Sequence, residues 1–294
     1  MSPGPSTVRL TWRQLWRRAA EELGSGTEAR WLVEDVSGLD AAGWLLACDD
    51  KAPAGAVRGL DELVRRRKAG EPLQHVLGHW SFRTVEVVVD RRVLVPRPET
   101  EVLVAHALAC LDRLAPAADG RELLAADLGT GSGVIALSLA AERQGIQVVA
   151  TDRSREALAV ASANLVQLPA AAAARVRLYE GDWFAALPAE LAGSIDVVAS
   201  NPPYLAEHEW DDLDPVVRDF DPRGALVAGP SGFEALEAVI GQAPGWLGPH
   251  GFLLVELAPT QAPAALELAR DAGYSSARVE EDLAGRSRVL VASR

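Results

Sequence analysis

The first part of the chain carries apolar residues at the spacing of amphipathic helices. One helix would begin after Thr11, a favourable N-cap residue, and end at Gly24. Its apolar positions lie on one face: Trp12, Leu15, Trp16, Ala19 and Leu23. The same spacing predicts three further helices, at about residues 27–37, 41–47 and 54–68. Residues 1–80 are therefore expected to form a small helical domain.

The fourth of these helices ends in a run of basic residues, Arg65-Arg66-Arg67-Lys68. Basic side chains in a last helical turn interact favourably with the helix dipole, so an exposed helix end is the simpler interpretation. A contact with RNA or with an acidic partner is the alternative.

The next segment has the alternating pattern of β-strands. Residues 85–89 place a valine at every second position, and residues 93–95 would form a second strand after a short turn. We expect a β-hairpin linker over residues 81–98. Pro98 suits the first turn of the following helix, and Arg97 stands where the linker meets that helix, in a position to point into a cleft.

From about residue 120 onward, short apolar runs alternate with helical patterns. The runs predict strands at residues 123–126, 147–150, 176–179, 195–199 and 251–257. Helices are expected at residues 133–142, 154–164, 231–240 and 260–272, and a closing antiparallel pair at residues 277–279 and 288–291. This alternation predicts an α/β fold with a doubly wound, mostly parallel, Rossmann-like sheet over residues 99–294.

Net charge, apolar runs and the number of cysteines and histidines exclude several classes of function. The net charge of −12 argues against charge-driven binding to nucleic acid or anionic membranes and favours a basic partner. No apolar run approaches the length of a membrane span, and residues 1–7 lack a signal-peptide core, so we expect a frayed tail there. Cys48 and Cys110 are far apart and the histidines are scattered, which predicts neither a disulfide framework nor a metal site. A reducing, cytoplasmic location is expected.

A glycine-rich loop follows the first predicted strand of the sheet: Gly129, Thr130, Gly131, Ser132 and Gly133. Such glycines let the backbone approach a ligand closely, and the loop leads into a helix N-terminus. Asp152 follows the second strand, where a carboxylate can bind ribose hydroxyls. Residues 131–136 also match the loose dinucleotide pattern G-x-G-x-x-A, so on this loop alone a dehydrogenase is the alternative.

Two further features favour S-adenosylmethionine over a dinucleotide. Asp127, just before the loop, would repel a pyrophosphate but suits a cationic ligand with an amino-acid moiety. Asp182 and Trp183, after the third strand, offer a carboxylate for the adenine amine and a ring for stacking. Core packing is the alternative for Trp183 and Phe184, because aromatic residues are usually buried.

The segment after the strand at residues 195–199 carries the candidate chemistry: Asn201, Pro202, Pro203 and Tyr204. The prolines stiffen the segment and hold it extended. The side-chain oxygen of Asn201 and the carbonyl of Pro202 can then both accept hydrogen bonds from a planar primary amide or exocyclic amine, and Tyr204 can stack on it. An ordinary proline-rich turn is the alternative.

Five segments together resemble one known family, the peptide chain release factor glutamine methyltransferases (HemK/PrmC). They occur there in the same order and lie here at residues 70–78, 95–101, 129–133, 182–184 and 201–204. The Asn-Pro-Pro-Tyr motif alone is shared with amino-directed methyltransferases of DNA, RNA and ribosomal proteins. The first two segments are more specific, and the resemblance covers the whole chain.

The resemblance implies a class I methyltransferase that methylates the side-chain amide nitrogen of the glutamine in a release factor's Gly-Gly-Gln loop. By that analogy Asn201 and Pro202 hold the amide and Tyr204 lines the pocket. S-adenosylmethionine would be held by residues 129–133, Asp152, Asp182, Trp183 and Asn201. The helical domain would dock the release factor, and a monomer without sequence-specific nucleic-acid binding is expected.

Some alternatives stay open at this point. The acceptor could be a ribosomal protein or a nucleobase amine, and the chain could be a catalytically inactive adaptor, although the intact loop and Asn201 argue against the adaptor. The acidic residues after the motif form either a lid for a basic partner or a solvated loop. They are Glu207, Glu209, Asp211, Asp212, Asp214 and Asp219.

Overall fold

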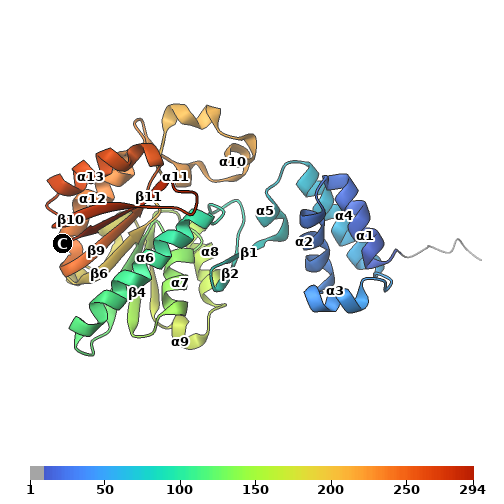
Figure 1. The fold of residues 1–294 in the computed structure, drawn as a ribbon, viewed down its shortest axis with the longest axis horizontal. Coiled ribbons are helices and arrows are strands. Elements are labelled where there is room, and N and C mark those ends of the chain that lie inside the picture. Colours follow the sequence, from blue (N-terminus) through green and yellow to red (C-terminus); the bar gives the residue numbers. More distant parts are fainter. Residues whose placement is uncertain (1–9) are drawn as a thin grey trace, which may run out of the picture. The chain divides into compact units, whose positions relative to one another are not determined.

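The computed structural model describes residues 10–294, so the tail expected at residues 1–7 lies outside the described part. The described residues divide into two compact units, residues 10–78 and 79–294 (Figure 1). The first unit is all helical. Its helices are α1 (Trp12–Leu23), α2 (Gly26–Ser37), α3 (Ala41–Ala47), α4 (Ala54–Lys68) and α5 (Leu73–Leu77).

Four of these helices confirm the predicted pattern. The side-chain oxygen of Thr11 accepts a hydrogen bond from the Gln14 amide, and Gly24 ends α1 in the left-handed conformation, with a φ of 68°. Leu15, Leu32 and Leu60 are fully buried where α1, α2 and α4 pack together. The short helix α5 was not predicted.

The basic run at the end of α4 is used inside this unit. Each side chain pairs with a glutamate: Arg65 with Glu62, Arg66 with Glu71, Arg67 with Glu28 and Lys68 with Glu22. Arg66 also donates to the carbonyls of His75 and Val76 in α5. These contacts favour an intramolecular structural role for the run over an RNA contact.

The β-hairpin is present, but the predicted strand pairing was wrong. β2 (Val85–Val88) pairs antiparallel with the preceding β1 (His79–Phe82), not with residues 93–95. The turn between them places Arg83 at a φ of 50°, without the glycine or asparagine that marks most such turns. Residues 93–95 form no strand; Val93 instead packs against Ala157 and Val160 of the second unit.

The second unit is built on a seven-stranded sheet of order β10-β11-β9-β6-β3-β4-β5. The strands are β3 (Leu123–Leu128), β4 (Ile146–Asp152), β5 (Val176–Glu180), β6 (Ile195–Ser200), β9 (Leu247–Glu256), β10 (Ser276–Glu281) and β11 (Ser287–Ser293). Strands β9, β6, β3, β4 and β5 are parallel to one another. Strand β11 pairs antiparallel with β9, and β10 pairs antiparallel with β11. The predicted fold class is confirmed.

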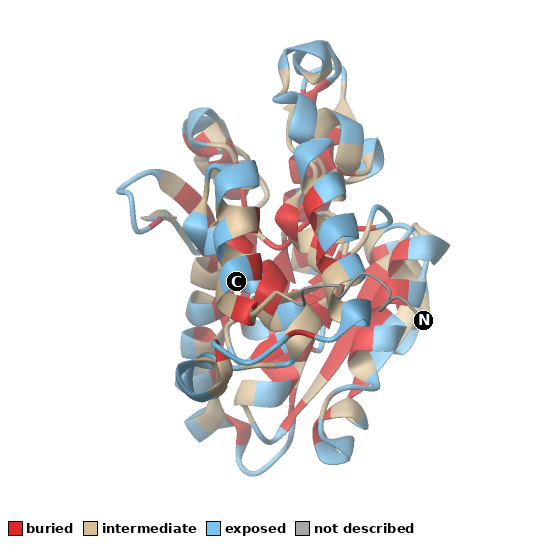
Figure 2. Cartoon of the chain, turned by 90° about the vertical axis from the view of Figure 1, so that its right-hand side faces the viewer, coloured by how far each residue is buried: buried red, intermediate tan, exposed pale blue. Residues whose placement is uncertain are grey.

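Helices cover both faces of this sheet (Figure 1). Strands β3, β4, β6, β9 and β11 are mostly buried, whereas the edge strands β5 and β10 are largely exposed or half-buried (Figure 2). One face packs against α6 (Pro98–Leu114) and α7 (Val134–Glu142), and α8 (Arg155–Leu165) adjoins α7. The other face packs against α12 (Glu234–Trp246) and α13 (Ala262–Asp271). Helix α12 begins three residues after Ser231, the predicted cap, whose hydroxyl instead accepts the Phe233 amide.

The chain reverses direction across the sheet between β3 and β6. From β3 it proceeds outward to β4 and β5, then returns to the other side of β3 to form β6. In a parallel sheet, ligands bind at the carboxyl ends of the strands beside such a reversal. The glycine-rich loop follows β3 and Asn201 follows β6, so the fold brings the two predicted motifs to the same edge.

Shorter elements complete the unit. They are β7 (Leu205–Ala206), α10 (Pro215–Phe220), α11 (Arg223–Leu226), β8 (Val227–Gly229) and α9 (Ala170–Ala173). Helix α9 consists of four consecutive alanines. Within residues 10–294, no helix is both long and apolar enough to cross a bilayer.

Candidate cofactor and substrate site

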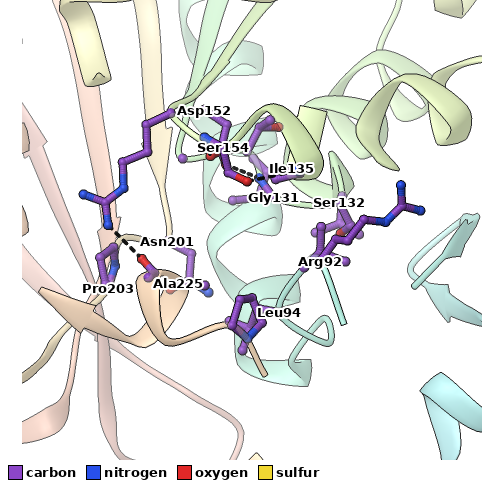
Figure 3. Close-up of a pocket in the computed structure, with 18 of the residues that line it drawn as sticks. Arg92, Leu94, Gly131, Ser132, Ile135, Asp152, Ser154, Asn201, Pro203 and Ala225 are labelled. Atoms are coloured by element: carbon purple, nitrogen blue, oxygen red, sulfur yellow. Dashed lines mark hydrogen bonds between the residues drawn. The ribbon is translucent and has the colours of Figure 1, made fainter. Parts of the chain in front are cut away.

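A cavity of about 320 Å³ opens at the carboxyl ends of these strands (Figure 3). Most of the predicted site residues line it: Gly129, Thr130, Gly131, Ser132, Asp152, Asp182, Trp183, Asn201 and Pro203. The Ser200 hydroxyl donates to the Leu128 carbonyl at 2.7 Å, which ties the ends of β6 and β3 together beneath the two motifs.

The backbone of the glycine-rich loop is held by internal hydrogen bonds. The amides of Gly129 and Thr130 both donate to the Thr151 carbonyl at 2.9 Å, and the Gly133 amide donates to the Thr130 carbonyl. The Gly131 amide donates to the Asp152 carboxylate at 2.9 Å. Since a bound pyrophosphate needs free backbone amides, this loop is poorly suited to a dinucleotide.

Asp127 braces the loop from inside the protein and does not line the cavity. Its Oδ2 accepts hydrogen bonds from the Thr130 hydroxyl at 2.6 Å and the Ala136 amide at 3.1 Å. Burial raises the pKa of this carboxyl to about 7. Its buried Oδ1 has no hydrogen-bond partner within the described residues. Because Asp127 is fully buried and outside the cavity lining, the direct contact with a cationic ligand that the sequence suggested is not supported.

Asp152 lies at the end of β4 with its carboxylate fixed by two backbone amides. Oδ2 accepts from Gly131, and Oδ1 accepts from Ser154 at 2.8 Å (Figure 3). Each carboxylate oxygen keeps a further lone pair that can accept a hydrogen bond from a ribose hydroxyl. The geometry therefore suits the role predicted for this residue.

The two aromatic residues after β5 have different surroundings. Phe184 is buried and stacks on Trp246 with ring centroids 5.6 Å apart, so it belongs to the core. Trp183 is partly buried, lines the cavity and has a φ of 44°. A Cβ at Gly129 would lie 3.2 Å from its ring, so the glycine is needed for the close approach of the loop to the indole.

Asn201 is connected to two buried residues from distant parts of the chain. Its Nδ2 donates to the Thr100 hydroxyl at 3.1 Å, and that hydroxyl donates to Glu256 Oε2 at 2.7 Å. Glu256 is only 1% exposed, and this burial raises its pKa to about 7, although the Thr100 hydrogen bond and the charge of Arg288 act in the opposite direction.

Three predicted residues do not belong to the cavity lining. Gly133, with a φ of 90°, faces α7 and α8, where a Cβ would lie 3.2 Å from Leu137. Pro202 is buried. Tyr204 is anchored through its backbone, which donates to the Leu226 carbonyl and accepts from the Gln261 side chain, and burial raises the pKa of its phenol.

Comparisons with known proteins agree with this geometry. Residues 14–78 match the model of the PrmC N-terminal domain, and residues 108–218 match that of the methyltransferase small domain. The chain is 43% identical to the release factor glutamine methyltransferase of Bordetella pertussis, over 89% of this chain and 92% of that one. For the Rhodopirellula baltica enzyme the identity is 39%, over 82% and 80%. The chain belongs to the release factor glutamine methyltransferase family.

A solved structure with a similar fold is the hMettl16 catalytic domain in complex with an RNA hairpin. It covers 82% of this chain and 81% of its own, with a TM-score of 0.54 and 14% identity. At that identity the likeness shows the methyltransferase fold alone.

In this methyltransferase, Thr100 lines the cavity and Glu256 is its buried hydrogen-bond partner, and sequence reasoning singled out neither residue. Thr100 lies within the family segment at residues 95–101, but its polar partner is 156 residues away along the chain. Arg97 was expected near a cleft; it lines the cavity and pairs with the buried Asp221 at 2.6 Å. Arg153, also in the lining, donates to the Gly224 carbonyl at 3.2 Å.

The acidic segment after Tyr204 is partly structured by its own side chains. Glu209 accepts the Ala206 amide at 2.7 Å, and Asp214 caps α10 through the Val216 amide. Asp219 pairs with Arg218. These three carboxylates therefore have local structural roles, and whether the segment also acts as a lid stays a prediction.

Proposed function

We propose that this protein transfers a methyl group from S-adenosylmethionine to the side-chain amide nitrogen of the glutamine in the Gly-Gly-Gln loop of a peptide chain release factor. Family membership supports the class of reaction and of substrate. The observation that carries the proposal is the position of Asn201, in the same cavity as the glycine-rich loop and Asp152.

The cofactor supplies an electrophilic methyl group when it is bound. Asp152 would accept hydrogen bonds from its ribose hydroxyls, and Asp182 and Trp183 would hold the adenine. Residues 129–132 would contact its amino-acid portion. The apolar walls of the cavity, which include Leu94, Val134 and Ile135, suit a ligand that carries no phosphate.

The substrate nitrogen needs help from the protein, because an amide lone pair is delocalised into the carbonyl. Asn201 Oδ1 and the Pro202 carbonyl would accept hydrogen bonds from its two N–H groups. This orients the nitrogen toward the methyl group and favours the less conjugated form. The nitrogen becomes cationic on methylation and then loses a proton, so no general base is required before the bond forms.

The remaining features of the chain fit the same proposal. We assign the helical unit at residues 10–78 to docking of the release factor, and the net charge of −12 favours a basic protein surface over nucleic acid. Cys48 and Cys110 are both free and buried, in keeping with a reducing, cytoplasmic location.

A transfer assay with S-adenosylmethionine labelled in its methyl group tests the proposal. Purified release factor, ribosomal proteins and ribosomal RNA are offered separately, and a release factor whose Gly-Gly-Gln glutamine is replaced by alanine serves as the matched control. We expect label in the intact release factor alone. Label in ribosomal protein or RNA, or equal label in the glutamine-free factor, would reject the proposed substrate.

A further inference from the structure

We infer that Thr100 and Glu256 are positioning residues that fix the rotation of the Asn201 side-chain amide, so that its oxygen faces the substrate. The inference rests on the proposed function and deepens it. Neither residue needs to touch the substrate, because both act through Asn201.

The direction of the hydrogen bonds follows from the chemistry of the three side chains. An ionised carboxylate can only accept, so the single hydroxyl hydrogen of Thr100 is committed to Glu256 Oε2 at 2.7 Å. The Thr100 oxygen can then only accept, and the Asn201 group that faces it must be Nδ2, at 3.1 Å. The amide oxygen of Asn201 is thereby directed away from Thr100.

This rotation decides whether Asn201 can bind a primary amide. With Oδ1 toward the substrate, Asn201 accepts one of the substrate N–H groups. With the amide turned over, Nδ2 would face that N–H group, and two donors would oppose each other in a partly buried site. A donor left unpaired in this way weakens binding of the substrate amide.

The three residues come together because of the fold. Thr100 lies in the first turn of α6 and is 3% exposed, and Glu256 is the last residue of β9. Strand β9 runs parallel to β6, with Val255 paired to Ser200, so Glu256 and Asn201 leave the sheet at the same level. Exclusion of water from Thr100 and Glu256 leaves the Thr100 hydroxyl no competing solvent partner.

The charge state of Glu256 controls the direction of this chain of hydrogen bonds. The charged groups that act on it are Arg288 of β11 and Arg97 and Glu99 at the start of α6; Tyr204 is a titratable neighbour that feels its charge. Burial outweighs the two arginines and raises the pKa of Glu256 to about 7. A protonated Glu256 can donate to Thr100, which frees the Thr100 hydrogen to donate to Asn201 Oδ1 and turns the amide over.

Thr100→Val and Thr100→Ser test the positioning role in the full-length protein. Valine keeps the shape of threonine but removes the hydroxyl, and serine keeps the hydroxyl. We expect Thr100→Val to lower kcat for release factor methylation by about tenfold or more, with the affinity for S-adenosylmethionine nearly unchanged and the protein still folded at the assay temperature. Its thermal midpoint should fall, because Glu256 and Asn201 each lose a hydrogen-bond partner. Thr100→Ser should retain most of the turnover. Full activity of Thr100→Val, or an equal loss in both variants, would overturn the inference.

Asn201 directly follows β6, so a substitution that destabilises β6 could also lower activity. Asp196→Asn is the control for this effect. Asp196 is a buried carboxylate near the start of the same strand, where it accepts hydrogen bonds from Arg121 and the Leu124 amide. A loss of strand stability would appear in this variant as well. A loss of positioning would appear in the Thr100 variant alone.

A second readout does not depend on methyl transfer. The side-chain amide signals of Asn201 are identified in a ¹H–¹⁵N spectrum by their absence in Asn201→Ala. In the wild type they should shift as the pH passes through about 7, and this shift should vanish in Thr100→Val and Glu256→Gln. Asn201 amide signals that do not shift with pH in the wild type, or that shift equally in all variants, would contradict the inference. Failure of the wild type to methylate a release factor would instead reject the proposed function.

Discussion

Asn201 depends on residues that lie far from it in the sequence. A stiff Pro202-Pro203 segment could be predicted, because proline chemistry is local. Its two acceptors, the Asn201 side-chain oxygen and the Pro202 carbonyl, stay a prediction. Thr100 and Glu256 could not be assigned to the site, since a threonine in a helical first turn and a glutamate at a strand end have no distinctive local signal. Their role depends on the pairing of β6 with β9.

Replacement of Asn201 by alanine removes one of the two proposed acceptors. We expect turnover to fall about 100-fold or more, the scale for loss of a preorganised polar contact in a transition state. The affinity for S-adenosylmethionine, measured by calorimetry, should change little. An Asn201→Ala enzyme with normal turnover would show that the assignment is wrong.

Gly129→Ala should weaken cofactor binding. The new Cβ would lie 3.2 Å from the Trp183 ring, at a backbone φ of 72°, so the ring must move from the wall of the cavity. We expect the dissociation constant for S-adenosylmethionine to rise by about tenfold, the equivalent of about 1.4 kcal/mol.

Gly145→Ala is the control for the strain of placing an alanine at a positive φ. Gly145 has a similar φ of 70°, and a Cβ there would meet nothing within 4 Å. Both variants should therefore lose some stability, but only Gly129→Ala should lose cofactor affinity. Equal affinities in the two variants would exclude the contact with Trp183 as the cause.

At the level of elements, the predictions succeeded where the pattern was long and failed where the partner of a segment had to be chosen. Helix α3 was predicted at its observed bounds, and β3, β4 and β6 each extend a predicted run. The hairpin was assigned the wrong second strand because Arg83 makes a tight turn without glycine. Helix α5 is only five residues long, too short for a periodic signal.

The contacts of Arg66 at the end of α4 are expected to stabilise α5. Arg66 forms an ion pair with Glu71 and donates to two carbonyls of α5. Arg66→Ala should destabilise α5 by about 1–3 kcal/mol, because hydrogen bonds to a charged group are lost. Faster amide exchange at residues 73–78 of the full-length protein would report this. Arg65→Ala is the control, since Arg65 pairs with Glu62 on its own helix, and it should leave that exchange unchanged.

At the level of the whole molecule, a buried acid beneath the cofactor loop links stability to pH. The pKa of Asp127 rises on folding from 3.8 to about 7, so the folded state binds this proton more tightly than the unfolded state. The stabilisation is fully present below about pH 4 and is lost as the pH rises through about 7.

Asp127→Asn isolates this contribution. Between pH 5 and 8 the free energy of unfolding of the wild type should fall relative to that of the variant, by about 2–3 kcal/mol. Denaturant unfolding at several pH values measures the difference. Parallel pH profiles for the two proteins would show that the proton on Asp127 is bound no more tightly in the folded state.

The proposed reaction methylates one nitrogen atom, so locating the methyl group on the product tests it. Purified release factor is incubated with this protein and S-adenosylmethionine, digested, and sequenced by mass spectrometry. We expect a single methyl group on the side-chain nitrogen of the Gly-Gly-Gln glutamine, and no methyl group when Asn201→Ala replaces the wild type. An unmodified glutamine, with S-adenosylmethionine binding demonstrated in the same sample, would contradict it.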